Sequence, residues 1–134
     1  MLPLPHLKGS PLLLFLSFFY FSLLLLPVAK PDLASERAAL VALRKAVGGR
    51  TLFSNLTDPN ACNWAGVQCE RDGIVELHLP GVALSGPLPT GVFGNLTNLR
   101  TLSLRFNALT GTLPSDLASC VNLRNLYLQQ NLFS

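Results

Sequence analysis

Residues 100–114, R-T-L-S-L-R-F-N-A-L-T-G-T-L-P, decide the fold because the chain repeats their pattern on both sides. Residues 75–89 are V-E-L-H-L-P-G-V-A-L-S-G-P-L-P, and residues 124–134 are R-N-L-Y-L-Q-Q-N-L-F-S. Aligned on these segments, Leu77, Leu102 and Leu126 recur at intervals of 25 and 24 residues. A period of this length is typical of a solenoid, in which each repeat forms one coil and stacks on the next.

Each repeat contains a short strand in which leucine alternates with polar residues, as in T-L-S-L at residues 101–104. An alternation of period two points the leucines to one side, so we expect them in a core shared by all coils. Asn107 and Asn131 follow two of the strands, and we expect their amides to turn inward and bond backbone groups of neighbouring coils. Val82 takes this position in the first coil. Cys120 takes the position that Leu96 has one coil earlier, which predicts a core side chain.

Before the repeats, residues 33–47 are predicted to form a helix that caps the first coil. Asp32 or Ser35 can accept hydrogen bonds from the free N–H groups of its first turn. Gly48 and Gly49 are expected to end it in the left-handed conformation. Leu33, Leu40, Leu43 and Val47 fall on one side of a 3.6-residue period and should be buried, whereas Arg37, Arg44 and Lys45 should form the solvated face. The pattern as a whole predicts an α/β solenoid.

The first residues resemble a secretory leader. Lys8 precedes an apolar run from Leu12 to Leu26, which is too short to cross a bilayer and matches the hydrophobic region of a signal peptide. We therefore predict a signal peptide at residues 1–29, cleaved after Ala29, with an uncleaved signal anchor as the alternative. Without Lys8, nine of the ten basic residues remain beside seven acidic ones. They form no run of like charge, so nucleic acid is a poor candidate partner.

The cysteines suit an oxidising compartment. Six residues separate Cys62 from Cys69 in the segment C-N-W-A-G-V-Q-C, which predicts a local disulfide. A zinc site is the alternative, but it needs four ligands, and His78 is the one histidine left after the predicted cleavage. We therefore predict no metal and no cofactor. Trp64, between the two cysteines, is expected to pack and to cover the open edge of the first strand. Asn55 and Asn95 begin N-x-T sequons and are candidate glycosylation sites.

Together these features resemble the plant leucine-rich-repeat receptor-like kinases. L-x-x-L-x-L-x-x-N-x-L-x-G-x-L-P, nearly complete from Leu99 to Pro114, is similar to the plant-type repeat. The helix at 33–47 followed by C-N-W-A-G-V-Q-C is similar to the N-terminal cap of these receptors. The segment from Asp32 to Arg50 is also similar to a subgroup with short ectodomains and atypical kinases. The resemblance implies a leucine-rich-repeat cap with its disulfide at residues 30–73, then about three coils at 74–134, the last incomplete, with a short parallel sheet on the concave face.

The family resemblance implies an extracellular recognition module in signalling, entering the secretory pathway and binding a peptide or protein, including a co-receptor ectodomain. In such receptors, further repeats, a transmembrane span and a kinase follow, and we expect this chain to be a fragment that lacks them. The alternative is a short secreted repeat protein that acts as a decoy or inhibits cell-wall-degrading enzymes. With about three coils and an exposed last strand, we expect marginal stability and association through that edge.

Residues between the inward leucines are predicted to line the concave face, where a partner would bind. Arg105, Phe106 and Tyr127 are the first candidates, because arginine and aromatic side chains dominate interaction hot spots. His78 and Glu76 lie on one strand face about 7 Å apart by strand rise, but no nucleophile or metal cluster accompanies them, so we predict no catalytic residue and no enzyme. The predicted partner-binding residues are Glu76, His78, Thr101, Ser103, Arg105, Phe106, Asn125, Tyr127 and Gln129.

Overall fold

The computed structural model describes residues 32–49, 52–71 and 73–134. The predicted signal peptide at 1–29 lies outside the described residues. No helix among the described residues is both long and apolar enough to span a bilayer. The elements, in chain order, are the helix α2 (Leu33–Val47), the 3₁₀ turn η2 (Ala61–Asn63), the strands β1 (Val67–Glu70), β2 (Gly73–His78) and β3 (Ser85–Pro87), the turn η3 (Phe93–Asn95), the strands β4 (Thr101–Ser103) and β5 (Ala108–Gly111), the turn η4 (Ser115–Ser119), and the strands β6 (Asn125–Tyr127) and β7 (Leu132–Phe133).

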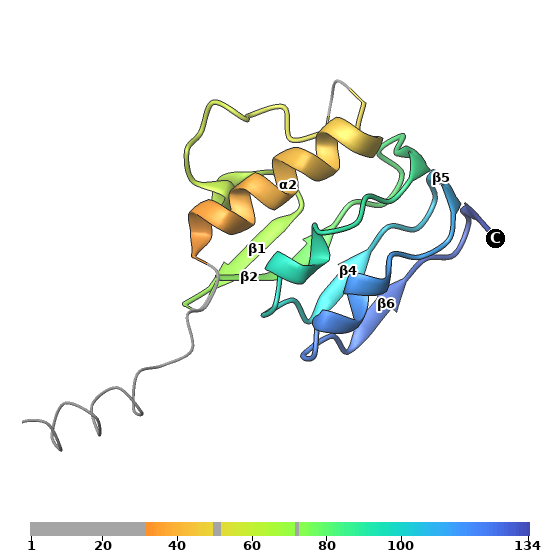
Figure 1. The fold of residues 1–134 in the computed structure, drawn as a ribbon. Helices are drawn as coiled ribbons and strands as arrows, with labels where there is room; N and C mark the ends of the chain where they lie inside the picture. The colour runs from red at the N-terminus through yellow and green to blue at the C-terminus, as the bar shows by residue number, and fades with distance from the viewer. Residues whose placement is uncertain (1–31, 50–51, 72) are drawn as a thin grey trace, which may run out of the picture. The chain divides into compact units, whose positions relative to one another are not determined.

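The repeats stack into a solenoid, as predicted. One sheet has the strand order β1-β2-β4-β6, and β3-β5-β7 form a second, narrower sheet (Figure 1). Strands β2, β4 and β6 run parallel, with Leu77 beside Leu102 and Leu102 beside Leu126. Corresponding residues of successive coils are therefore neighbours. Leu77, Leu79, Leu102 and Leu104 are buried in one core that continues into the cap, whereas Leu126 on the last strand is exposed.

The predicted asparagine ladder is confirmed. The Oδ1 atom of Asn107 accepts hydrogen bonds from the backbone N–H groups of Val82 and Leu84 at 3.0 and 3.1 Å. Its Nδ2 atom donates to the carbonyls of Leu79 and Leu104 at 2.9 and 2.8 Å. Asn131 makes three of the four equivalent bonds one coil later: it accepts from the N–H of Leu109 and donates to the carbonyls of Leu104 and Leu128. Val82 stands where the first coil lacks an asparagine, and its backbone N–H is bonded by Asn107 of the second coil.

Helix α2 has the predicted bounds but ends differently from the prediction. Of the two candidate caps, Asp32 is the one that acts, because its side chain accepts the N–H of Ser35 at 2.9 Å. Gly48 has φ −86° and ψ 141°, so the expected left-handed end is wrong. Glycine is needed there for space, since a Cβ atom on Gly48 would lie 2.6 Å from the side chain of Leu52 and 2.9 Å from the carbonyl of Arg44.

The buried face of α2 also departs from the prediction. Leu40, Leu43 and Val47 are buried, but Leu33 is exposed, and the buried residue of the first turn is Glu36. Both carboxylate oxygens of Glu36 accept the N–H of Ile74, at 3.2 and 3.3 Å, at the start of the repeats. Glu36 therefore joins the cap to β2, and removal from water raises the pKa of its carboxyl group.

The burial of Glu36 makes stability depend on pH. Its pKa is raised above the ordinary value of 4.5 in the folded state, so the folded protein holds this proton more tightly than the unfolded chain does. The resulting stabilisation is present below the ordinary pKa and is lost as pH rises through the folded value. We expect Glu36→Gln, which keeps the neutral form, to gain stability relative to the wild type as pH rises from 4 toward 7. Urea unfolding at several pH values measures this, and a constant difference would contradict it.

Two of the three basic residues expected on the solvated face of α2 instead hold the loop that follows the helix. Arg37 donates to the carbonyl of Leu56 at 2.9 Å, and Arg44 donates to the carbonyl of Leu52 at 2.7 Å. Lys45 is exposed, as predicted. The guanidinium of Arg37 also lies 5.2 Å from the ring centroid of Trp64. Long basic side chains thus cover apolar surface while their charged ends bind backbone carbonyls.

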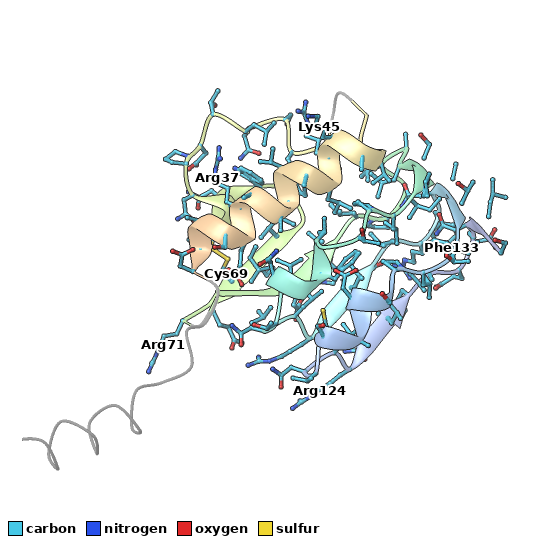
Figure 2. All side chains as sticks on the ribbon, viewed as in Figure 1. Arg37, Lys45, Cys69, Arg71, Arg124 and Phe133 are labelled. Atoms are coloured by element: carbon cyan, nitrogen blue, oxygen red, sulfur yellow. A yellow bond between two sulfur atoms is a disulfide. The ribbon has the colours of Figure 1, made fainter. Side chains whose placement is uncertain are left out.

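Strand β1 covers the edge that Trp64 was expected to cover. It pairs antiparallel with β2, and Val67 lies beside Leu77. Trp64 packs as predicted, but in the cap core, where its ring centroid lies 5.2 Å from that of Phe53. The predicted Cys62–Cys69 disulfide is present and joins η2 to β1 (Figure 2). The disulfide therefore fixes the strand that closes the N-terminal edge of the sheet.

Cys120 is a core residue, as predicted, and its thiol should be unreactive in the folded protein. Its Sγ atom lies 3.3 Å from the carbonyl oxygen of Phe93. Burial, aided by the charge of Asp116, raises its pKa from 9.0 to about 11. Below both values this shift lowers the thiolate fraction about 100-fold. We expect a thiol reagent to modify Cys120 at least about 100-fold more slowly in the native protein than in denaturant, and comparable rates would contradict its burial.

Candidate binding surface on the parallel sheet

The predicted columns of residues on the outer face of the parallel sheet are confirmed by the strand register. Glu76 lies beside Thr101, and Thr101 beside Asn125. The next column is His78, Ser103 and Tyr127. Backbone bonds from Gly81 to the carbonyl of Arg105, and from Phe106 to the carbonyl of Gln129, extend this alignment past the strand ends. The structure thus brings all nine predicted residues onto one face.

These residues differ in how much surface they offer a partner. Thr101 and Ser103, on the central strand β4, are only 7% and 4% exposed. The Oγ1 atom of Thr101 also accepts a hydrogen bond from Nδ2 of Asn125 at 3.3 Å. Thr101 and Ser103 therefore form the floor of the surface. Contact area comes from the residues around this floor.

Arg105, Phe106 and Tyr127 form the most prominent group on this face, which we call the aromatic cluster. The Arg105 guanidinium lies 5.7 Å from the ring centroid of Phe106 and 6.0 Å from that of Tyr127. Phe106 is 56% exposed and Tyr127 is 41% exposed. The rings of Phe106 and Tyr127 already limit the orientations of the Arg105 guanidinium in the unbound protein. A binding partner that contacts Arg105 therefore causes a smaller loss of side-chain conformational entropy than it would with a freely moving arginine.

The backbone holds Phe106 in an unfavourable conformation. Its φ is +60°, and the equivalent positions of the other coils, Gly81 and Gln130, have φ of +62°. A side chain at a left-handed position costs roughly 1–2 kcal/mol, so the turn geometry of the repeat imposes the conformation. Glycine at position 81 meets this geometry without strain. At position 106 the same turn displays an exposed aromatic ring.

Glu76 and His78 form a hydrogen bond rather than a separated pair. The Nε2 atom of His78 lies 2.7 Å from Oε2 of Glu76, and both side chains are partly exposed. In the described part of the chain, no group of three or more His, Cys, Asp or Glu residues is placed to hold a metal ion. The pair adds polar side chains to this surface, with His78 beside the buried Ser103.

One residue of this face was missed by the sequence analysis. Gln68 on β1 lies beside Glu76, so it extends the first column by one strand toward the cap. The alternation of V-Q-C-E after Gly66 could have indicated a strand, but its pairing with β2 depends on the bend at Gly66. Gly66 has φ +85°, and a Cβ atom there would clash with the carbonyl oxygen of His78.

Family models match nearly all of the described chain. The model described as the leucine-rich-repeat N-terminal domain matches residues 33–70, and the leucine-rich-repeat model matches residues 74–133. The chain belongs to the leucine-rich-repeat family. The two matches together cover the cap and the coils, so this assignment agrees with the stacked strands and with the asparagine ladder.

This leucine-rich-repeat chain has plant receptor kinases as sequence relatives. It is 58% identical over 107 residues to one probable inactive receptor kinase of Arabidopsis thaliana and 54% identical over 104 residues to another, RLK902. These matches cover 78% and 75% of the chain but only 16% of each relative. The chain therefore spans about a sixth of the length of these two relatives.

Solved structures with the same fold have different ligands. The ectodomain of the Arabidopsis receptor kinase HAESA, in complex with a peptide hormone, is 30% identical with a TM-score of 0.66, over 75% of this chain and 17% of that one. A plant ice-binding protein is 25% identical with a TM-score of 0.65, over 72% of this chain and 32% of that one. The fold alone therefore does not define the ligand, which depends on the exposed residues.

Proposed function

We propose that this chain is the partner-recognition part of a plant receptor-like kinase, exposed outside the cell, with no catalytic activity of its own. The observation that carries the proposal is the aromatic cluster of Arg105, Phe106 and Tyr127, exposed on a rigid parallel sheet. Arginine and large aromatic side chains provide most of the binding energy in protein interfaces. Sites on strands are also held more precisely than sites on loops.

The proposed partner is a peptide or a protein, including a co-receptor ectodomain. The surface combines a cation and two aromatic rings with polar side chains, and such a mixture suits an interface with an apolar centre and a polar rim. The HAESA ectodomain, 30% identical to this chain, has been solved with a peptide hormone and with the co-receptor SERK1. The proposed contact residues are Gln68, Glu76, His78, Arg105, Phe106, Asn125, Tyr127 and Gln129, with Thr101 and Ser103 as the floor.

Three features support a location outside the cell. The Cys62–Cys69 disulfide fits an oxidising compartment. Residues 1–29 have the composition of a signal peptide. Asn55 and Asn95 begin sequons for N-linked glycosylation, which fit a protein of the secretory pathway. In the structure Nδ2 of Asn55 donates to the carbonyl of Asn63, and Nδ2 of Asn95 donates to the carbonyl of Gly91.

We further propose that in the full receptor another coil packs against β6. On this last coil Leu126 is 40% exposed and Phe133 is only partly buried. In the coil before, the equivalent residues Leu102 and Leu109 are fully buried. Leu126 and Phe133 would become buried in the same way if the stacking continues, and a membrane span and kinase would follow the last coil.

Secretion tests the proposed location most simply. We would express the complete chain in plant cells and compare it with a variant that lacks residues 1–29. The proposal predicts processed protein with an intact disulfide in the extracellular fluid, and cellular retention of the shortened variant. Retention of the complete chain inside the cell with its leader intact would contradict it. Binding of the secreted protein to a panel of plant extracellular peptides and ectodomains then tests recognition.

A further inference from the structure

We infer that the first sugar of an N-linked glycan on Asn95 packs into a groove between helix α2 and the loop before η3, and stabilises the contact between cap and coils. The inference rests on the secretory route proposed above. The groove has a volume of about 390 Å³. Its lining residues are Ser35, Ala38, Ala39, Ala42, Thr90, Gly91, Val92 and Asn95. Asn95 is thus both a wall of the groove and the acceptor of a sequon.

The position of the Asn95 amide directs an attached sugar along the groove. Its Nδ2 atom donates to the carbonyl of Gly91, another lining residue, at 3.0 Å. A primary amide has two N–H hydrogens, and glycosylation replaces one of them. The bond to Gly91 can therefore persist and restrict rotation of the Asn95 side chain. The sugar then starts at the groove wall.

The chemistry of the lining matches a sugar ring. Ala38, Ala42 and Val92 present methyl groups, and Ser35 and Thr90 contribute hydroxyls at the margins. The lining contains no charged side chain. A hexosamine is neutral, with C–H groups on its ring faces and polar groups around its rim. Its ring face can cover the alanine methyl groups while its hydroxyls stay near water, as amphipathic groups do at such boundaries.

Asn55 provides the contrast within the same chain. Its Nδ2 atom donates to the carbonyl of Asn63 in the loop after α2, and Asn55 does not line the groove. A glycan on Asn55 therefore starts outside this groove. Only the glycan on Asn95 lies where it can connect α2, which belongs to the cap, to η3, which belongs to the first coil.

The test compares unfolding with and without the first sugar on Asn95. The complete chain would be made in plant cells and trimmed enzymatically to one sugar per site. Thr97→Ala removes the sequon and leaves Asn95 in place, whereas Thr97→Ser keeps it as the matched control. Covering roughly 50 Å² of apolar surface corresponds to about a tenfold lower unfolding equilibrium constant. We expect this difference between the Thr97→Ser and Thr97→Ala proteins, and less than about a twofold effect from Thr57→Ala at the other sequon.

A second variant shows whether the groove is responsible. Ala42→Leu fills the groove with a residue of similar helix propensity, so the sugar effect should fall below about twofold in this background. An undiminished effect in Ala42→Leu would overturn the inference, as would equal stability of the Thr97→Ser and Thr97→Ala proteins. Peptide mapping separates the remaining outcomes. Modified Asn55 with unmodified Asn95 contradicts this inference alone, whereas two unmodified sites also contradict the proposed secretory route.

Discussion

Asn107→Ala should lower the free energy of unfolding by about 3–5 kcal/mol. The Asn107 side chain accepts hydrogen bonds from the N–H groups of Val82 and Leu84 and donates to the carbonyls of Leu79 and Leu104. All four bonds are partly buried. Alanine removes the Asn107 bonds to the N–H groups of Val82 and Leu84 and to the carbonyl of Leu79, whereas the carbonyl of Leu104 keeps its bond from Asn131. Each unsatisfied buried group costs roughly 1–3 kcal/mol, and partial hydration reduces the sum.

Urea unfolding monitored by circular dichroism measures this loss, and two further variants make it specific. Asn107→Asp keeps both acceptor contacts but loses the donors, so it should fall between the wild type and Asn107→Ala. Asn122→Ala removes one exposed bond to the carbonyl of Thr97 and should change stability by less than about 0.5 kcal/mol. If Asn107→Ala is as stable as Asn122→Ala, the asparagine ladder does not hold the coils together.

Trp64→Ala should destabilise the cap by about 3–5 kcal/mol. Trp64 is 2% exposed and contacts both the ring of Phe53 and the guanidinium of Arg37. Its Nε1 atom also donates to the carbonyl of Asp58 at 3.1 Å. Truncation leaves a large cavity in the buried core of the cap.

The matched variant for this prediction is Trp64→Phe. It keeps an aromatic ring but loses the N–H donor to Asp58, so its cost should be about 1–2 kcal/mol. Thermal unfolding of the two variants beside the wild type measures both costs. A cost for Trp64→Ala no larger than that for Trp64→Phe would show that the ring does not support the cap.

The coils could be predicted from sequence because every coil obeys the same geometric rule. Once residues 100–114 were aligned with the segments on either side, the neighbours of Leu102 across the sheet followed, and the columns of polar residues followed with them. The inward position of Asn107 came from the same alignment. Periodic stacking converts sequence spacing directly into spatial contacts.

The cap could be predicted only in part, because its contacts occur once and follow no period. The bounds of α2 were correct, yet helix periodicity placed Leu33 in the core and gave no indication that Glu36 is buried. Glu36 is buried because its carboxylate accepts the N–H of Ile74, which is 38 residues away. Strand β1 was missed because a tight bend at Gly66 creates it. Apolar spacing alone does not reveal such long-range polar contacts.

The candidate site was likewise predictable only in part. The alternation of residues along each strand predicted the face on which each side chain lies, but it did not predict how exposed each side chain is. Thr101 and Ser103 are nearly buried because both have a neighbouring strand on each side. Phe106 projects because its turn requires a left-handed residue, and the alignment of Phe106 with Gly81 contained that signal. Exposure depends on neighbours across the sheet, which a single strand does not specify.

The most direct test of the recognition surface is a peptide-binding measurement on the secreted protein. Peptides would be selected from a displayed library on the wild-type protein and then measured against two variants. Arg105→Ala/Tyr127→Ala removes two members of the aromatic cluster, and Lys45→Ala changes an exposed cation on α2. We predict at least about tenfold weaker binding for the first variant and unchanged binding for the second. Equal binding to all three proteins would contradict recognition through the concave face.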